Sequence, residues 1–441
     1  MVRKLKVMGA ALFFVACGTA VPLHAQQSLS PPAVIPSDPG EYVARAGNCV
    51  ACHSVPGGKA FTGGLKMMTP LGVIYTTNIT PDPETGIGDY TLEDFDRAVR
   101  LGVAKDGHHL YPAMPYPSYA KLRPEDVKAL YDYFMKSVPA VKQPDQPSDI
   151  PWPLNIRWPL AFWNLIFADD KPYADKPGHD ATWNRGAYLV QGPGHCGACH
   201  TPRGPVFNEK ALDESGIAFL AGGPLDNWSS PNLTQAVNTG LGRWSAADIA
   251  AYLKAGHNDH GTAFGSMIDV INNSTQYFTD ADIAAIAAYL KSLPPAREPA
   301  SVTAYTYDPA TAAALHATPL TQAGAVTYVQ RCESCHDSDG SGSAPYLPAL
   351  AGNPAVLDND PTSLINITLN GSARIVVAGM PDAYRMPQFR VTLTNQEIAD
   401  AISFTRAAWG NKAGPVTADQ VAAVRRETNP ASDKIEILRM K

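Results

Sequence analysis

Cysteine spacing constrains this chain more than any other feature of its sequence. Six of the seven cysteines occur in three Cys-x-x-Cys-His motifs. The motifs are Cys49-Val50-Ala51-Cys52-His53, Cys196-Gly197-Ala198-Cys199-His200 and Cys332-Glu333-Ser334-Cys335-His336. Two thiols at this spacing can form thioethers to the two vinyl groups of one haem, and the adjacent histidine then coordinates its iron. The sequence therefore predicts three covalently bound haem c groups, held by the cysteines and ligated by His53, His200 and His336.

The same six thiols permit a second interpretation. In an oxidising compartment they could form three disulfides or a zinc site. That interpretation does not explain why a histidine follows every cysteine pair, so we favour haem attachment.

The N-terminus has the pattern of an export signal, assigned to residues 1–25. A basic start is followed by an apolar run, Val7 to Val21, that is too short for a stop-transfer helix. An alternative, lipidation at Cys17, is disfavoured because Phe14 stands where such signals usually carry Leu. Removing this segment takes away three basic residues and no acidic one, so the net charge falls from −6 to −9. With no basic run, this balance argues against a nucleic-acid partner.

The motifs recur 147 and 136 residues apart, which predicts three tandem domains in 441 residues. Each motif follows a short helical segment, and each repeat closes with an amphipathic helix of period 3.6. Pro124 opens the first closing helix, and Thr279 and Thr394 cap the second and third, with Asp282 at the capping-box position of the second. We expect a mostly α-helical chain of three class I cytochrome c domains. The predicted boundaries are 38–145, 179–296 and 319–412 for the domains, 146–178 and 297–318 for linkers, and 413–441 for a C-terminal tail.

A haem in such a domain needs a second axial ligand from a loop before the closing helix. We predict Met114 in the first domain and Met267 in the second, because both lie at nearly the same distance from a repeated Asn-x-Thr segment. In the third domain Met380 and Met386 both precede proline, and we prefer Met386 because it lies nearer the closing helix. A methionine is more often a core side chain than a ligand, and here the repeat favours ligation. His108, His109, His257 and His260 are the rival ligands near the first two sites.

Longer segments of the chain resemble a known family. The words CVACHSVPGGKAFTGGL, TNITPDPETGIGDYTLEDF and YPAMPYPSY lie in the first domain, CHTPRG in the second and RMPQF in the third. They are similar to the triheme cytochrome c subunits of membrane-bound sugar, sugar-acid and alcohol dehydrogenases, and most of all to the gluconate 2-dehydrogenase type.

The resemblance implies the function of the chain and its location in the cell. Such a subunit passes electrons from a flavoprotein or quinoprotein catalytic subunit to ubiquinone, alongside a small third subunit. It implies peripheral attachment at the periplasmic face of the inner membrane. The chain shows no credible dinucleotide-binding fingerprint, so we expect no substrate-oxidising site of its own. The alternatives are a subunit of a quinoprotein alcohol or aldehyde dehydrogenase, a free-standing periplasmic shuttle, and a peroxidase-like enzyme.

An aromatic and apolar segment, residues 151–167, separates the first two domains. Trp158, Phe162 and Trp163 could place it in a membrane interface, where tryptophan is favoured. We favour the other interpretation, an interdomain linker packed against its neighbours or buried against the dehydrogenase subunit. In the second domain, Arg203 follows His200 closely and is placed to pair with a haem propionate or to remain on the surface.

Overall fold

Helices make up most of the regular structure in the computed structural model, which describes residues 33–299, 301–317 and 319–430. The predicted export signal and residues 431–441 of the predicted tail lie outside the described residues. Strands occur in the described ranges only as short antiparallel hairpins, such as β1–β2, where Lys66 pairs with Tyr75. The mostly α-helical prediction is therefore confirmed. No helix in the described part of the chain is both long enough and apolar enough to cross a membrane.

The helices form three successive groups along the chain. The first group contains α1 (Pro39–Ala46), α2 (Cys49–Cys52), β1 (Lys66–Thr69), β2 (Gly72–Tyr75), α3 (Leu92–Leu101), α4 (Tyr116–Tyr119) and α5 (Pro124–Lys136). The second contains α7 (Ala181–Gln191), α8 (Gly197–His200), β3 (Gly223–Leu225), β4 (Trp228–Ser230), α9 (Ala246–Ala255), β5 (His257–Asn258), β6 (Gly261–Thr262), α10 (Met267–Asn273), η1 (Thr275–Tyr277) and α11 (Asp280–Ser292). The third contains α13 (Ala325–Arg331), α14 (Glu333–His336), α15 (Pro354–Leu357), α16 (Thr362–Asn370), β7 (Val376–Val377), β8 (Met380–Pro381) and α17 (Asn395–Ala407).

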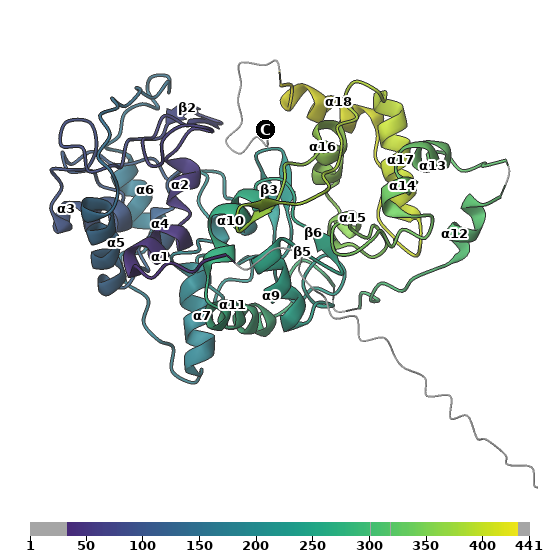
Figure 1. Cartoon of the computed structure of the whole chain (residues 1–441), viewed down its shortest axis with the longest axis horizontal. Coiled ribbons are helices and arrows are strands. Elements are labelled where there is room, and N and C mark those ends of the chain that lie inside the picture. Colours follow the sequence, from purple (N-terminus) through teal and green to yellow (C-terminus); the bar gives the residue numbers. More distant parts are fainter. Residues whose placement is uncertain (1–32, 300, 318, 431–441) are drawn as a thin grey trace, which may run out of the picture.

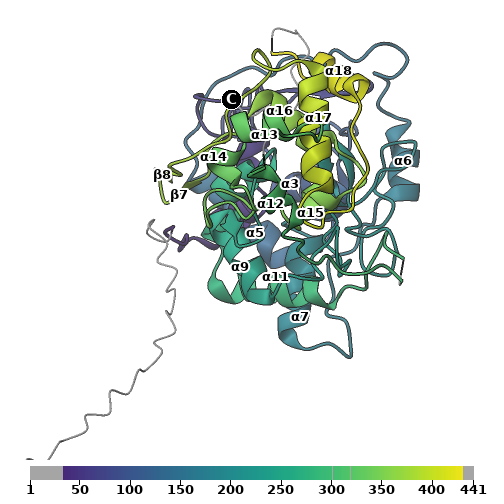
Figure 2. The same cartoon turned by 90° about the vertical axis from the view of Figure 1, so that its right-hand side faces the viewer.

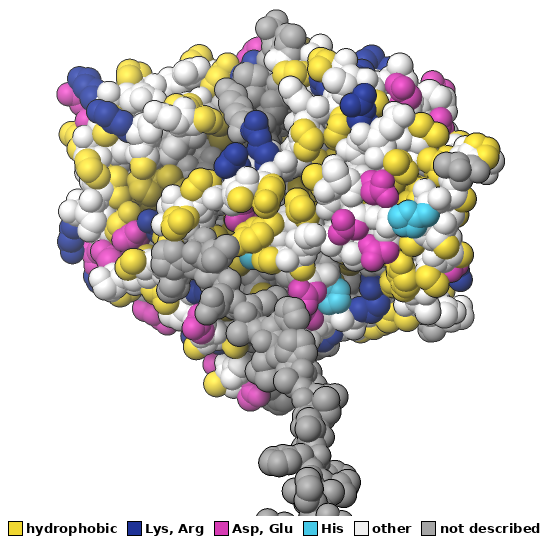
Figure 3. Space-filling model, turned by 45° about the vertical axis from the view of Figure 1, so that its right-hand side comes forward, with side chains coloured by type: hydrophobic (Ala, Val, Ile, Leu, Met, Phe, Trp, Pro, Cys, Tyr) yellow, Lys and Arg dark blue, Asp and Glu magenta, His cyan; other side chains and the backbone are white. Residues whose placement is uncertain are grey.

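Three further helices are α6 (Leu160–Phe167), α12 (Ala310–Leu315) and α18 (Ala418–Glu427). Of these, α12 and α18 pack on the third group, because Leu315, Val421 and Val424 are buried in its core clusters. Figure 1 shows the first group at the left, the second in the middle and the third at the right, while Figure 2 shows α6 at the edge of the molecule. On the face drawn in Figure 3, Lys and Arg side chains lie among Asp and Glu side chains instead of forming one basic patch.

In every group the first helix packs on the closing helix at a glycine. A Cβ built at Gly40 would lie 2.1 Å from the carbonyl oxygen of Ala129, and one at Gly186 would lie 2.0 Å from that of Ala285. In the third group a Cβ built at Gly324 would lie 2.1 Å from the carbonyl oxygen of Asp400. The two backbones therefore approach more closely than any side chain would permit.

The predicted closing helices are present as α5, α11 and α17. Thr394 and Glu397 form a complete capping box at the start of α17. At α11 the Thr279 side chain accepts from the Asp282 amide, but the Asp282 carboxylate bonds to Arg185 and Tyr42 instead of returning to the cap. The capping-box prediction for Asp282 is therefore half right, because two partners distant in sequence compete for its carboxylate.

Candidate haem-binding sites

Each Cys-x-x-Cys-His motif forms a single helical turn, α2, α8 or α14, directly after the first helix of its group. None of these six cysteines, all within the described residues, forms a disulfide, so all six are available for thioether bonds. Burial raises the pKa of Cys49 and Cys196 to about 12 and that of Cys332 to about 11, which indicates surroundings of low polarity.

The three motif histidines are held in the same way. Nδ1 of His53 lies 2.7 Å from the Thr77 carbonyl oxygen, Nδ1 of His200 lies 2.8 Å from that of Pro231, and Nδ1 of His336 lies 2.9 Å from that of Pro348. A hydrogen bond at Nδ1 fixes the ring orientation and leaves Nε2 for an iron ion.

Electrostatics favour the form of these histidines that binds metal. Burial lowers the pKa of His53, His200 and His336, and the bond to a carbonyl oxygen opposes that change only in part. The imidazoles are therefore neutral near pH 7, which is the state an iron ligand requires.

Sequence reasoning missed the carbonyl groups that orient these rings. A signal was available, because Thr77 and Pro231 directly precede the repeated segments that begin at Asn78 and Asn232. In both groups the asparagine is buried, and its side-chain oxygen accepts the amide two residues later at 2.9 Å. The repeated Asn-x-Thr segment therefore holds in place the loop that orients the histidine.

Replacing Asn232 by alanine should disturb the second site selectively. The Asn232 side chain accepts from the amide and hydroxyl of Thr234 and donates to the Ala296 carbonyl oxygen at 2.7 Å. Losing these buried bonds should cost about 2–4 kcal/mol and loosen the adjacent Pro231 carbonyl. Thermal unfolding would measure the loss of stability, and a potentiometric titration should show a shift in one of the three haem potentials. An unchanged melting curve would contradict the prediction. Replacing the exposed Asp259 by alanine is the surface control and should leave the melting curve unchanged.

The predicted methionine ligands differ in their surroundings. Met114 is half-buried and packs on the same core cluster as Cys49, whereas Met267 begins α10 and packs beside Ile268, Ile271 and Ile375. Met386 is half-buried, and its amide donates to the Ser372 hydroxyl at 2.9 Å. Met380 is 49% exposed on β8. Ligation by Met114, Met267 and Met386 stays a prediction.

Most rival histidines have other partners. His108 lies 2.6 Å from Asp106, His257 packs against the ring of Tyr346, and His260 stacks on Trp244. Nδ1 of His109 is buried without a hydrogen-bond partner in the described structure. His109 is therefore the rival that the structure leaves available in the first group.

Two further side chains bear on whether a haem fits. Arg203 donates to the carbonyl oxygens of Ala198, inside the second motif, and of Phe207 at 3.0 Å, so it supports the motif backbone. The indole N–H of Trp244 is buried and has no partner among the described residues. Trp244 packs in the core cluster that Cys196 also contacts. A buried donor without a partner is costly, and a haem carboxylate would satisfy it.

Comparison with known proteins decides the family. A sequence model described as cytochrome c matches three segments, residues 37–138, 184–294 and 321–409, which together exceed half of the chain. The chain belongs to the cytochrome c family. The matched segments contain all three Cys-x-x-Cys-His turns, so covalently bound haem c and electron transport are the cofactor and process of this protein.

Three of the similar proteins are named as subunits of dehydrogenases. The alcohol dehydrogenase (quinone) cytochrome c subunit of Gluconacetobacter polyoxogenes is 50% identical over 98% of this chain and 92% of its own length. The gluconate 2-dehydrogenase cytochrome c subunit of Pantoea cypripedii is 52% identical over 88% of this chain and 89% of its own length. The fructose dehydrogenase cytochrome subunit of Gluconobacter japonicus is 40% identical over 88% of this chain and 82% of its own length. This cytochrome c is therefore a member of the group of dehydrogenase cytochrome subunits.

Proposed function

We propose that this cytochrome c is the triheme electron-transfer subunit of a membrane-bound periplasmic dehydrogenase of the gluconate 2-dehydrogenase type. It receives electrons from a flavoprotein or quinoprotein catalytic subunit, with a small third subunit in the complex, and delivers them to ubiquinone. The observation that supports this most directly is the threefold repetition of a Cys-x-x-Cys-His turn that contains no disulfide and whose histidine is fixed through Nδ1.

The proposal assigns site residues and domains. The haems are attached at Cys49 and Cys52, Cys196 and Cys199, and Cys332 and Cys335. The axial pairs are His53 with Met114, His200 with Met267, and His336 with Met386. The chain is divided into class I cytochrome c domains at 38–145, 179–296 and 319–412, joined by the linkers and followed by the tail given above. Haem supplies reversible one-electron chemistry, and the polypeptide fixes the ligands and their surroundings.

The partner enzyme is tested by isolating the native protein from membranes in mild detergent. Bound subunits would be identified by mass, and ubiquinone reduction assayed with gluconate, ethanol, fructose and an aldehyde. A stoichiometric flavoprotein with gluconate-driven reduction is the expected result. Ethanol-driven reduction with a quinoprotein would favour the alternative indicated by the 50% identical alcohol dehydrogenase subunit. Recovery of this chain alone would overturn the subunit role and indicate a shuttle.

We further propose that α6 attaches the protein to the bilayer surface. The helix has the sequence Leu-Ala-Phe-Trp-Asn-Leu-Ile-Phe, without a charged side chain. Phe162, Leu165 and Ile166 are 60%, 81% and 69% exposed. Apolar side chains exposed together at one edge of a protein favour insertion into the lipid interface.

The structure changes which residues belong to this surface. Trp163 is half-buried, its indole N–H donates to the Val206 carbonyl oxygen at 3.0 Å, and its ring packs on Tyr116. The neighbouring Asn164 accepts from the Tyr116 hydroxyl at 2.7 Å. Tyr116 thereby holds α6 on the first group and Val206 holds it on the second, so Trp163 does not belong to the exposed surface.

Replacing Phe162, Leu165 and Ile166 together by serine should release the protein from membranes. Removing three partly inserted apolar side chains should weaken binding by about 3 kcal/mol, roughly a hundredfold in the partition coefficient. Co-sedimentation with phospholipid vesicles measures the change. A matched control exchanges Val34, Ile217 and Val391, which are 86%, 91% and 82% exposed elsewhere on the molecule. Normal haem content with unchanged vesicle binding would contradict the proposal and indicate that α6 packs against another subunit.

A further inference from the structure

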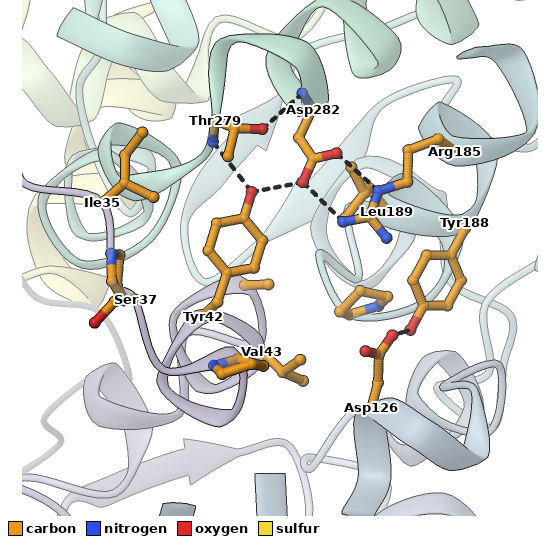
Figure 4. A pocket seen from close by; sticks show the side chains of 14 residues that line it. Ile35, Ser37, Tyr42, Val43, Asp126, Arg185, Tyr188, Leu189, Thr279 and Asp282 are labelled. Atoms are coloured by element: carbon orange, nitrogen blue, oxygen red, sulfur yellow. Dashed lines mark hydrogen bonds and ion pairs between the residues drawn. The ribbon is translucent and has the colours of Figure 1, made fainter. Parts of the chain in front are cut away.

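The first and second helical groups share a polar and well-ordered contact. The Tyr42 hydroxyl donates to the Asp282 carboxylate at 2.5 Å, and Arg185 donates to both oxygens of that carboxylate at 2.7 Å. Figure 4 shows Tyr42 and Arg185 approaching Asp282 from opposite sides. Ala46, at the end of α1, also belongs to the core cluster of the second group. The two groups are therefore fixed in one relative orientation.

This orientation brings the first two Cys-x-x-Cys-His turns together. Tyr119, at the end of α4, is 8% exposed, and its hydroxyl donates to the Gly47 carbonyl oxygen at 2.7 Å. The Tyr119 ring stacks on His195, with ring centroids 5.5 Å apart and planes at 24°. Gly47 lies two residues before Cys49, and His195 directly precedes Cys196. One aromatic pair therefore connects the two turns.

Other contacts place the same two sites side by side. Helix α2, which carries Cys49 and Cys52, contacts α10, which begins at Met267. The Arg45 guanidinium of α1 also lies over the Tyr277 ring of η1, 3.9 Å from its centroid.

The local backbone supports a functional role for this contact. His195 has φ of 37°, in the left-handed region that non-glycine residues rarely adopt. Such a conformation persists only where its surroundings enforce it. Burial lowers the pKa of His195, so its ring is neutral and stacks without adding a charge. In the third group the buried Tyr328 instead donates to the Asp337 carbonyl oxygen within its own group.

We propose that Tyr119 and His195 hold the first two Cys-x-x-Cys-His turns against each other, so that the haems attached there form one electronically coupled pair. The inference rests on the proposed haem attachment. Tyr119 is a positioning residue, since its hydroxyl holds the first turn and its ring holds the residue before the second. Within this pair, one electron would pass from the reduced haem to the oxidised haem. No proton or further reactant takes part in that transfer.

The first test asks which haems are coupled. In the wild-type holoprotein, two closely spaced haems should give a two-signed Soret circular dichroism band. The band should persist in the Cys332→Ser/Cys335→Ser variant and vanish in the Cys196→Ser/Cys199→Ser variant. Haem content, measured by the pyridine haemochrome, must be three per chain in the wild type. Fewer than three would contradict the proposed function itself, whereas three haems without a two-signed band would overturn only the pairing.

The second test concerns Tyr119. Tyr119→Leu removes the ring and should abolish or strongly reduce the two-signed band and shift two of the three potentials. Tyr119→Phe keeps the ring and should retain the band if stacking is what positions the turns. Tyr131→Leu is the matched control, because its ring packs on Phe95 and its hydroxyl donates to the Tyr90 carbonyl oxygen at 2.9 Å, both within the first group, and it should leave the band unchanged. A band unchanged in both Tyr119 variants, or lost equally in Tyr131→Leu, would overturn the role of Tyr119.

Discussion

Replacing Gly186 by alanine is expected to destabilise the second helical group by about 3 kcal/mol. The new Cβ would lie 2.0 Å from the Ala285 carbonyl oxygen and 2.8 Å from Cβ of Tyr289. Both contacts are far shorter than van der Waals separation, and the first is to backbone that cannot rotate away. Helices α7 and α11 would have to move apart along their contact and open the core that surrounds the second motif.

Whether Gly186→Ala lowers or raises the stability shows whether packing or helix propensity dominates at this position. Alanine is favoured over glycine inside a helix by about 1 kcal/mol, so propensity alone predicts that Gly186→Ala stabilises α7. Packing predicts a fall in the melting temperature of roughly 5–10 °C, measured by circular dichroism on the holoprotein. Gly414→Ala is the control, because no atom lies within 4 Å of a Cβ built there. Equal melting temperatures for the two variants would refute the packing argument.

Replacing Met386 by leucine should leave one haem without its methionine ligand. Leucine has nearly the same volume but no thioether, so the third haem should lose its iron–sulfur charge-transfer absorption in the near infrared. Its potential should also fall by a sizeable part of the ~0.8 V range that axial ligands span. The Met386 amide and carbonyl both bond to Ser372, at 2.9 Å and 3.0 Å, which fixes the position of this methionine.

Met380 provides the matched control for that experiment. It also precedes a proline, but it is 49% exposed on β8. Met380→Leu should leave the near-infrared absorption and all three potentials unchanged. Loss of the absorption in Met380→Leu, with retention in Met386→Leu, would reverse the assignment. Met114→Leu and Met267→Leu should each remove one further contribution if the other two ligands are assigned correctly.

The cofactor class and the helices that close each group could be predicted from sequence because both depend on neighbours along the chain. The Cys-x-x-Cys-His spacing sets the separation of two thiols and a histidine within one helical turn. The periodic apolar positions of α5, α11 and α17 likewise define a buried face without knowledge of the partner. Local chemistry of this kind determined the cofactor class and the mostly helical fold.

Contacts between distant segments were decided only by the tertiary structure. Asp282 bonds to Arg185 and Tyr42, and Trp163 turns inward toward Val206. The stacking of Tyr119 on His195 joins residues from two helical groups. Nothing in the local sequence selects these partners, since each depends on which faces meet after the helices have formed. The sequence by itself therefore determined the three Cys-x-x-Cys-His turns and the cofactor class, and packing between the groups decided which of these turns are neighbours.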